Sequence, residues 1–77
     1  MRPGIYQHYS GTMYLVQGTS RHSETLEELV VYRKLYGDYS LWVRPKALFE
    51  QNIEHEGKSK PRFTFIKSVD LEAPELR

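Results

Sequence analysis

Residues 27–49 read E-E-L-V-V-Y-R-K-L-Y-G-D-Y-S-L-W-V-R-P-K-A-L-F, the longest apolar and aromatic run of the chain, and include its only tryptophan. Two structures fit this stretch. In a helix, Thr25 and Glu28 would form a T-x-x-E capping box, and Gly37 would end the helix. In a hairpin, Gly37 and Asp38 would form a two-residue turn. We favour the hairpin, because β-branched and aromatic residues on both sides of this turn are typical of strands.

A two-residue turn fixes which residues of the two strands face each other. In that register Arg33 lies opposite Trp42 and Val31 lies opposite Arg44, so these four side chains share one face. Two guanidinium groups beside an indole can stack on it or bind a partner, which makes this the candidate working surface. A slip of one residue in register would exchange the faces. The other face carries the residues expected to form a wall of the core: Val30, Tyr32, Tyr36, Tyr39, Leu41 and Val43.

The composition restricts the class of protein. A length of 77 residues suits one domain near the lower size limit for a single hydrophobic core. The absence of cysteine excludes disulfides and thiolate zinc sites and is in keeping with a reducing cytoplasm. The net charge of +1 gives no global attraction to nucleic acid or anionic membranes. No stretch approaches the ~20 apolar residues of a membrane span, so we expect a soluble, cytoplasmic protein.

A first hairpin is expected near the N-terminus. Residues 4–9 alternate weakly, Ser10-Gly11 supplies a turn, and residues 13–17 resume as an apolar strand. Gly18 then interrupts the strand, which indicates a bend or bulge in a curved sheet. The polar residues 19–28 are expected to form a connecting loop.

The second half of the chain begins at Pro45, which ends the central strand and suits the first position of a short helical turn. This turn places Phe49 at an end of the core. Short strands are expected at residues 53–55 and 62–66, joined by a turn and a mobile K-S-K-P segment.

About five short strands with tight turns and one short helical turn predict a mainly β fold, a small, partly open barrel of the SH3-like kind. An OB-like barrel is the alternative. Closure is favoured because it hides strand edges that a flat sheet would leave unpaired. We expect residues 1–67 to form this single domain, and residues 68–77 to form a flexible or loosely docked tail.

The sequence offers little support for catalysis or for a metal. The histidines His8, His22 and His55 are far apart and form no H-x-x-x-H pair, so we predict neither a metal site nor a cofactor. His22 and Ser23 are adjacent, and neighbours on an extended chain point in opposite directions. The carboxylates of the polar loop are solvated there and lack the burial that general acid catalysis needs. A small enzyme of unknown reaction is therefore the less favoured alternative.

Binding of a protein segment or small ligand fits the sequence better, because small barrels commonly present an aromatic groove flanked by loops. Trp42 is either part of this groove or a core residue with an internal hydrogen bond. Arg44 either contacts the ligand or pairs with Glu24 and fixes the polar loop. That loop is explained by turn and capping chemistry or by a ligand-binding rim. The candidate residues are Tyr6, His8, Arg33, Trp42 and Arg44 on the face, and Arg21, His22 and Glu24 at the rim.

A single-stranded nucleic-acid-binding module is the second class of function, because basic residues interleave with aromatic ones as in single-strand platforms. The nearly neutral total charge argues against it. Affinity for a phosphate backbone falls steeply with salt, whereas a peptide groove responds weakly, so salt separates the two classes. The basic residues concerned are Arg21, Arg33, Arg44, Lys58, Lys60 and Arg62.

Several sequence motifs together resemble a small bacterial family, the domain of unknown function 1653. The motifs are Y-x-H-Y-x-G-x-x-Y-x-V at residues 6–16, R-H-S-E-T at 21–25, L-V-V-Y-x-x-L-Y-G-D-Y-x-L-W-V-R-P at 29–45, Phe49, and P-R-F at 61–63. The resemblance implies an SH3-like fold and no catalytic residue, because the family lacks an assigned activity. The chain departs from the pattern at Ser10, where the family often has lysine, and at Leu26, where it often has glycine. Leucine at this second position makes a tight turn less expected and leaves room for a helical turn after Thr25.

Overall fold

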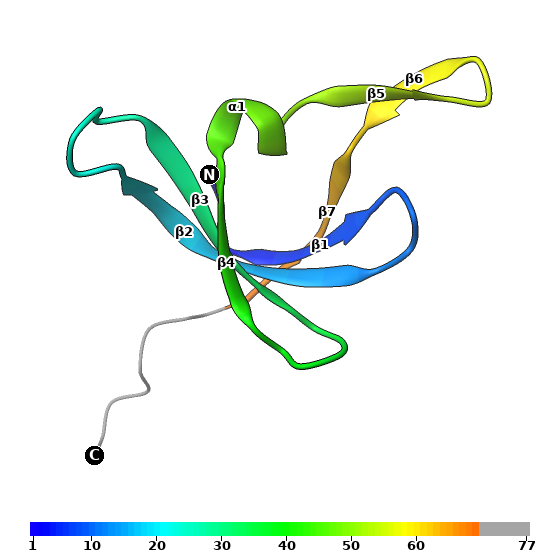
Figure 1. Ribbon diagram of the computed structural model, residues 1–77. Coiled ribbons are helices and arrows are strands. Elements are labelled where there is room, and N and C mark those ends of the chain that lie inside the picture. The colour runs from blue at the N-terminus through cyan, green and yellow to red at the C-terminus, as the bar shows by residue number, and fades with distance from the viewer. Residues whose placement is uncertain (70–77) are drawn as a thin grey trace.

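The computed structural model describes residues 1–69, which form seven strands and one short helix (Figure 1). The prediction of a mainly β fold with one short helical turn is confirmed. The count of about five strands was too low, partly because the K-S-K-P segment, expected to be mobile, is a strand. The elements are β1 (Gly4–His8), β2 (Met13–Arg21), β3 (Glu28–Lys34), β4 (Leu41–Pro45), α1 (Lys46–Phe49), β5 (Asn52–His55), β6 (Lys58–Pro61) and β7 (Phe63–Ser68).

Five of the strands form one antiparallel sheet in the order β4-β3-β2-β1-β7, and β5 and β6 form a separate two-stranded sheet. The large sheet is strongly curved (Figure 1). No pairing within residues 1–69 joins β4 to β7, so the sheet is not closed into a barrel and both strands remain edges. The predicted tail falls largely on residues 70–77, which lie outside the described residues.

Two features predicted for the N-terminal half are confirmed. Residues 4–8 and 13–21 pair as a hairpin, and the register of β2 against β3 shifts between Val16 and Gly18. Gln17 is therefore the extra residue of a bulge. The strands β2 and β3 extend further than expected, so that the polar loop is only residues 22–27.

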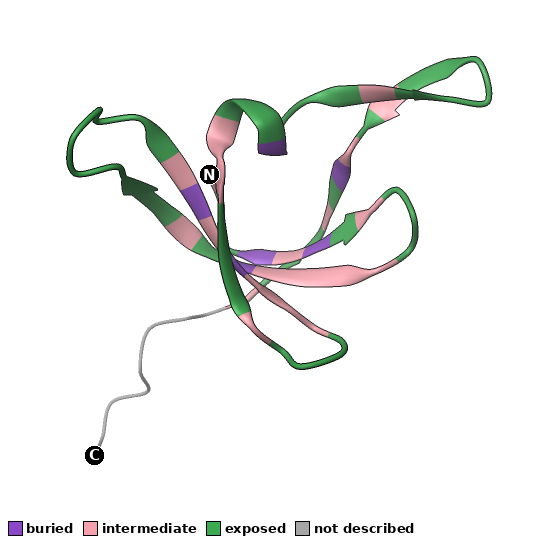
Figure 2. Ribbon diagram, viewed as in Figure 1, coloured by how far each residue is buried: buried purple, intermediate pink, exposed green. Residues whose placement is uncertain are grey.

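The buried core is small and mainly aromatic (Figure 2). Phe49, which the helical turn α1 carries into the core, is only 1% exposed, as predicted. Its ring stacks on that of Phe63, with 4.0 Å between the centroids and 4° between the planes. Tyr6 and Tyr32 meet the Phe49 ring edge to face at 5.7 and 5.5 Å. The helical turn thus links the centre of the sheet to β7, and the core consists of Tyr6, Val16, Val30, Tyr32, Phe49 and Phe63.

The central stretch is a hairpin, as predicted, but the predicted register is wrong by one residue. Tyr32 pairs with Trp42 and Val31 pairs with Val43, where the two-residue turn would have paired Tyr32 with Val43. The Lys34 N–H donates to the Ser40 carbonyl at 3.0 Å, so that the connecting loop has five residues, 35–39.

Backbone conformations and hydrogen bonds within the turn account for this longer loop. Gly37 (φ +61°) and Tyr39 (φ +54°) both adopt the left-handed conformation. The Asp38 carboxylate accepts a hydrogen bond from the Ser40 N–H at 3.1 Å, which is a local turn bond typical of aspartate. The Tyr39 N–H donates to the Tyr36 carbonyl at 3.1 Å, so Gly37 and Asp38 are the central residues of a β-turn. The Gly-Asp pair therefore lies inside a wider turn.

We predict that Phe49→Ala lowers the free energy of unfolding by about 3–5 kcal/mol, because it leaves a cavity against Phe63 and two tyrosine rings. Leu48→Ala is the matched control, since Leu48 is 47% exposed on the same helical turn, and it should change stability by less than about 1 kcal/mol. Urea unfolding followed by circular dichroism measures both. Equal losses for the two variants would contradict the assignment of Phe49 as the centre of the core.

Candidate functional site

The observed register determines which side chains share a face of the sheet. Because Tyr32 pairs with Trp42 and Val30 with Arg44, the indole and this guanidinium lie on the face that carries the core. Arg33 pairs with Leu41 on the opposite face, where its Nη1 donates to the Tyr39 carbonyl at 2.7 Å. The predicted grouping of Arg33 with Trp42 and Arg44 is therefore wrong for Arg33, and the slip in register accounts for it.

A cleft of about 220 Å³ opens over this face at the β4 edge. We call it the Trp42 cleft. Its walls come from three adjacent strands and from the turn that joins two of them, so the curved sheet itself brings them together. Four aromatic and two cationic side chains line it: Tyr14, Tyr32, Lys34, Tyr36, Trp42 and Arg44.

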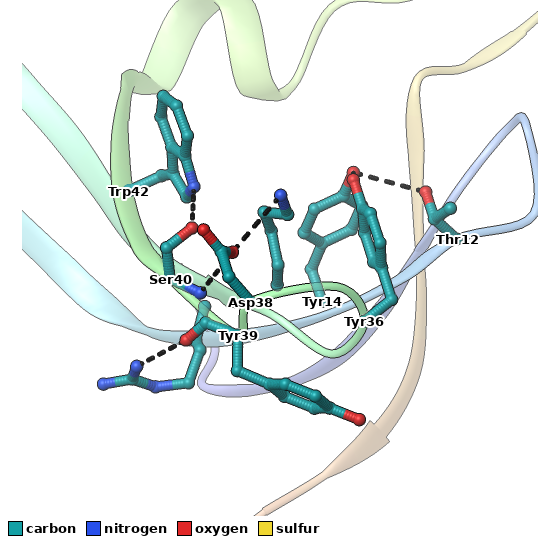
Figure 3. Close-up of polar contacts among 9 residues, drawn as sticks. Thr12, Tyr14, Tyr36, Asp38, Tyr39, Ser40 and Trp42 are labelled. Carbon is teal, nitrogen blue, oxygen red and sulfur yellow. Dashed lines mark hydrogen bonds and ion pairs between the residues drawn. The ribbon is translucent and has the colours of Figure 1, made fainter.

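Trp42 is an exposed residue, which excludes the core role considered for it. Its side chain is 52% exposed, so it is not part of the core. The indole N–H donates to the Ser40 hydroxyl at 2.6 Å (Figure 3). Ser40 is itself held by Asp38 in the turn. The same turn that sets the register therefore orients the indole.

Two phenols form the opposite wall of the cleft. The hydroxyls of Tyr14 and Tyr36 lie 2.9 Å apart, and the Thr12 hydroxyl donates to that of Tyr14 at 3.2 Å (Figure 3). The two rings meet edge to face with their centroids 5.7 Å apart. The hydrogen bond with Tyr14, and secondarily desolvation, raises the pKa of the Tyr36 phenol. The raised pKa favours the neutral form of the Tyr36 phenol.

The cations of the cleft differ in their partners. The Lys34 Nζ lies 3.5 Å from the Asp38 carboxylate. Arg44 lies 6.0 Å from the centroid of the Phe63 ring, and no carboxylate within residues 1–69 forms an ion pair with it. The ion pair with Glu24 that was one of the two roles considered for Arg44 is thus not formed. The Asp38 carboxylate thus balances Lys34, and Arg44 is the cation of the cleft that forms no ion pair within residues 1–69.

The 22–27 loop is a turn stabilised by its own side chains. The His22 Nδ1 accepts hydrogen bonds from the backbone N–H groups of Glu24 and Thr25, at 3.1 and 3.3 Å. The Thr25 hydroxyl accepts one from the Glu27 N–H at 3.2 Å. Leu26 adopts φ +62°, a left-handed conformation that favours glycine, so a tight turn forms here although leucine made it less expected. These bonds support turn and capping chemistry for the loop.

The residues expected at the rim do not line the Trp42 cleft. Arg21 lines a separate open groove of about 400 Å³ between the 22–27 loop and α1, and neither His22 nor Glu24 lines either one. An ion pair of 3.7 Å between Glu28 and Lys46 spans the base of that groove. The structure therefore separates the predicted rim from the predicted face.

Tyr6 and His8, the other two candidates, also lie outside the cleft. Tyr6 is a core residue whose hydroxyl donates to the Arg2 carbonyl at 2.8 Å. The His8 Nδ1 accepts a hydrogen bond from the Ser10 N–H at 3.2 Å. Burial, and then the charges of Arg62 and Arg44, lower the pKa of His8, which favours its neutral form. His8 instead lines a separate hollow of about 230 Å³ beside β6 and β7, so neither residue belongs to the Trp42 cleft.

The six basic residues considered for nucleic-acid binding are dispersed. Of these six, Arg44 alone lines the Trp42 cleft. Arg33 lies on the other face of the sheet, and Lys58 and Lys60 belong to the second sheet. They do not line one groove along which a phosphate backbone could run.

Two further observations concern other kinds of site. No three histidine or carboxylate side chains within residues 1–69 come together as metal ligands. In the same part of the chain, no helix has the length and apolar character needed to cross a membrane.

Sequence reasoning missed four members of the cleft: Tyr14, Tyr32, Lys34 and Tyr36. The signal was present, because Tyr14 pairs with Lys34 across β2 and β3, and Lys34 is two residues from Tyr32. Residues two apart on a strand share a face. With the register shifted by one residue, this spacing would have placed Lys34 beside Trp42.

The comparisons with known proteins identify relatives. Residues 4–65 match the family model described as protein of unknown function, DUF1653. Among solved structures, the chain is similar to the crystal structure of a DUF1653 protein from Bordetella bronchiseptica. The two are 34% identical with a TM-score of 0.81, and the match covers 94% of this chain and 95% of the other. No curated protein matches the chain.

We predict that Trp42→Ala changes the free energy of unfolding by less than about 1 kcal/mol, because the indole is half exposed and outside the core. Tyr32→Ala, its cross-strand partner, should cost about 3 kcal/mol or more, since its ring packs on Phe49. Urea unfolding followed by circular dichroism compares them. If Trp42→Ala lowers the free energy of unfolding as much as Tyr32→Ala does, Trp42 is part of the core.

Proposed function

The chain belongs to the DUF1653 family of proteins of unknown function, and we propose that it is a small binding module that recognises a protein segment through the Trp42 cleft. The observation that carries this proposal is the exposed indole of Trp42, 52% accessible and held in place beside Arg44. Tryptophan and arginine are the residue types that contribute most to binding energy at interfaces.

The fixed orientation of the indole favours binding. An interface pays an entropic cost for each side chain that it immobilises. The bond from the Trp42 N–H to Ser40, at 2.6 Å, already restricts the ring in the free protein. Less freedom therefore remains to be lost when a partner packs on it.

The charge of the cleft indicates the chemistry of the partner. The Lys34 Nζ forms an ion pair with the Asp38 carboxylate at 3.5 Å, whereas no ion pair to Arg44 is formed within residues 1–69. A guanidinium binds a carboxylate through two parallel hydrogen bonds. We therefore expect the bound segment to present an aspartate or glutamate close to an aromatic or apolar residue.

The size of the cleft favours a protein segment over a small molecule. Its volume of about 220 Å³ is below the ~300–1,000 Å³ typical of pockets that enclose a drug-sized ligand. A cleft of this size accommodates one or two side chains of an extended segment, while the rest of that segment lies on the surface.

The test is selection from a displayed library of random twelve-residue peptides, followed by calorimetric titration of the selected peptides. We predict enrichment of Asp or Glu near an aromatic residue. Trp42→Ala and Arg44→Gln should each weaken binding by at least about tenfold, as expected for central interface residues. Ile66→Ala is the matched control, because Ile66 is an exposed apolar residue on the other edge strand, β7, and it should leave the affinity unchanged.

Equal affinities for the wild type, Trp42→Ala and Arg44→Gln would contradict this function. A twelve-nucleotide oligothymidine distinguishes the nucleic-acid class. If the oligonucleotide binds more tightly than any selected peptide, and its affinity falls steeply between 50 and 200 mM salt, roughly as counterion release requires, the cleft serves nucleic acid instead.

A further inference from the structure

Strand β4 is an edge strand that exposes three consecutive apolar residues. Leu41, Trp42 and Val43 are 49%, 52% and 56% exposed, although they alternate between the two faces of the sheet. Edge strands are usually protected by charges, prolines or bulges along their length. On β4 the only charge and the only proline, Arg44 and Pro45, stand at its C-terminal end, so the middle of the edge is unprotected.

The hydrogen-bond pattern shows which backbone groups of this edge are available. In an antiparallel pair, residues that bond to the neighbouring strand alternate with residues that do not. The Lys34 N–H bonds to the Ser40 carbonyl, so the next bonded positions on β4 are Trp42 and Arg44. Leu41 and Val43 therefore direct their N–H and C=O groups away from β3, and β4 is the last strand of the described sheet.

We propose that the partner segment binds as an additional antiparallel strand along β4, so that strand pairing and the Trp42 cleft form one site. This rests on the proposed function and specifies how the segment is held. Residues of the segment opposite Leu41 and Val43 exchange main-chain hydrogen bonds with them. The residues opposite Trp42 and Arg44 then point into the cleft face, where an aromatic ring meets the indole and a carboxylate meets the guanidinium.

Charge favours such a segment over a second copy of this chain. Pairing of two β4 strands around Trp42 would place both clefts on the same face, because facing residues share a face. Each copy would add an Arg44 guanidinium to that face, and no ion pair to Arg44 is formed within residues 1–69, whereas Lys34 is already paired with Asp38. An acidic segment adds the missing opposite charge.

The probe is the peptide T-E-V-F-V-T, acetylated and amidated at its ends. In antiparallel pairing its glutamate faces Arg44, its phenylalanine faces Trp42, and its two valines face Val43 and Leu41. N-methylation of both valine nitrogens removes the two N–H groups that point toward β4. N-methylation of the phenylalanine and of the last threonine is the matched control, because those N–H groups point away from it.

We predict that the peptide binds the full chain and that methylation at the valines weakens binding by at least about tenfold, the effect of losing two hydrogen bonds. The control methylation should change the affinity by less than about threefold. In the free protein the amides of Leu41 and Val43 should exchange with solvent much faster than those of Trp42 and Arg44. Bound peptide should slow the exchange of both.

On the protein side, Val43→Pro removes the outward N–H at this position, whereas Val43→Ala retains it. Edge strands tolerate proline at positions whose N–H faces solvent. Val43→Pro should therefore lower the affinity for the peptide by at least about tenfold, and Val43→Ala should lower it by less than about threefold. The methylated peptides test the same bond without changing the protein.

Three results would overturn the proposal. If both methylated peptides bind as tightly as the parent and still require Trp42 and Arg44, the cleft binds side chains alone, and the proposed function stands without strand pairing. If the peptide fails to bind at millimolar concentration while library-selected peptides bind, the edge is not the site. If sedimentation shows a dimer that Val43→Pro abolishes, a second copy occupies β4.

Discussion

The five-residue turn at 35–39 is the constraint on which the working face of this protein depends. Three hydrogen bonds define it: from Lys34 to the Ser40 carbonyl, from Ser40 to the Asp38 carboxylate, and from Tyr39 to the Tyr36 carbonyl. A strand has a period of two, so a turn shorter or longer by one residue moves every side chain of β4 to the other face. The turn also holds the indole through Ser40, and one local structure therefore sets both the position and the orientation of Trp42.

The core supports this arrangement from behind. Phe49 enters from the helical turn and stacks on Phe63, and Tyr32 bridges Phe49 to Tyr14, with ring centroids 5.5 Å apart in each case. The same chain of aromatic rings that fills the centre of the sheet thus continues outward into the cleft. Because the sheet is not closed, its β4 edge remains accessible next to these rings. The buried core, the partly exposed cleft and the exposed β4 edge therefore lie next to one another.

The sequence predicted the parts of the fold that depend on local signals. Weak alternation predicted the first hairpin, and β-branched and aromatic residues around a Gly-Asp pair predicted the central one. Gly18 indicated the bulge, and Pro45 indicated the helical turn that buries Phe49. It did not predict the register, because Gly37-Asp38 has the composition of a two-residue turn, whereas Tyr39 adopts a left-handed conformation and the Lys34 N–H bonds to the Ser40 carbonyl. The segment 58–61 was missed as a strand because its polar residues pair with β5 and contribute nothing to the core.

The register also determines which of the candidate residues share a face of the sheet. Trp42 and Arg44 lie two apart on one strand, so they share a face in any register. Whether Arg33 lies on that face depends on the length of the turn. The most direct test is therefore the pairing itself, observed as nuclear Overhauser effects between Hα protons. Facing residues of a non-hydrogen-bonded antiparallel pair have Cα atoms only about 4.5 Å apart. The structure requires strong effects between Val31 and Val43 and between Arg33 and Leu41. Effects between Arg33 and Trp42 and between Val31 and Arg44 would show the two-residue turn and contradict the Trp42 cleft.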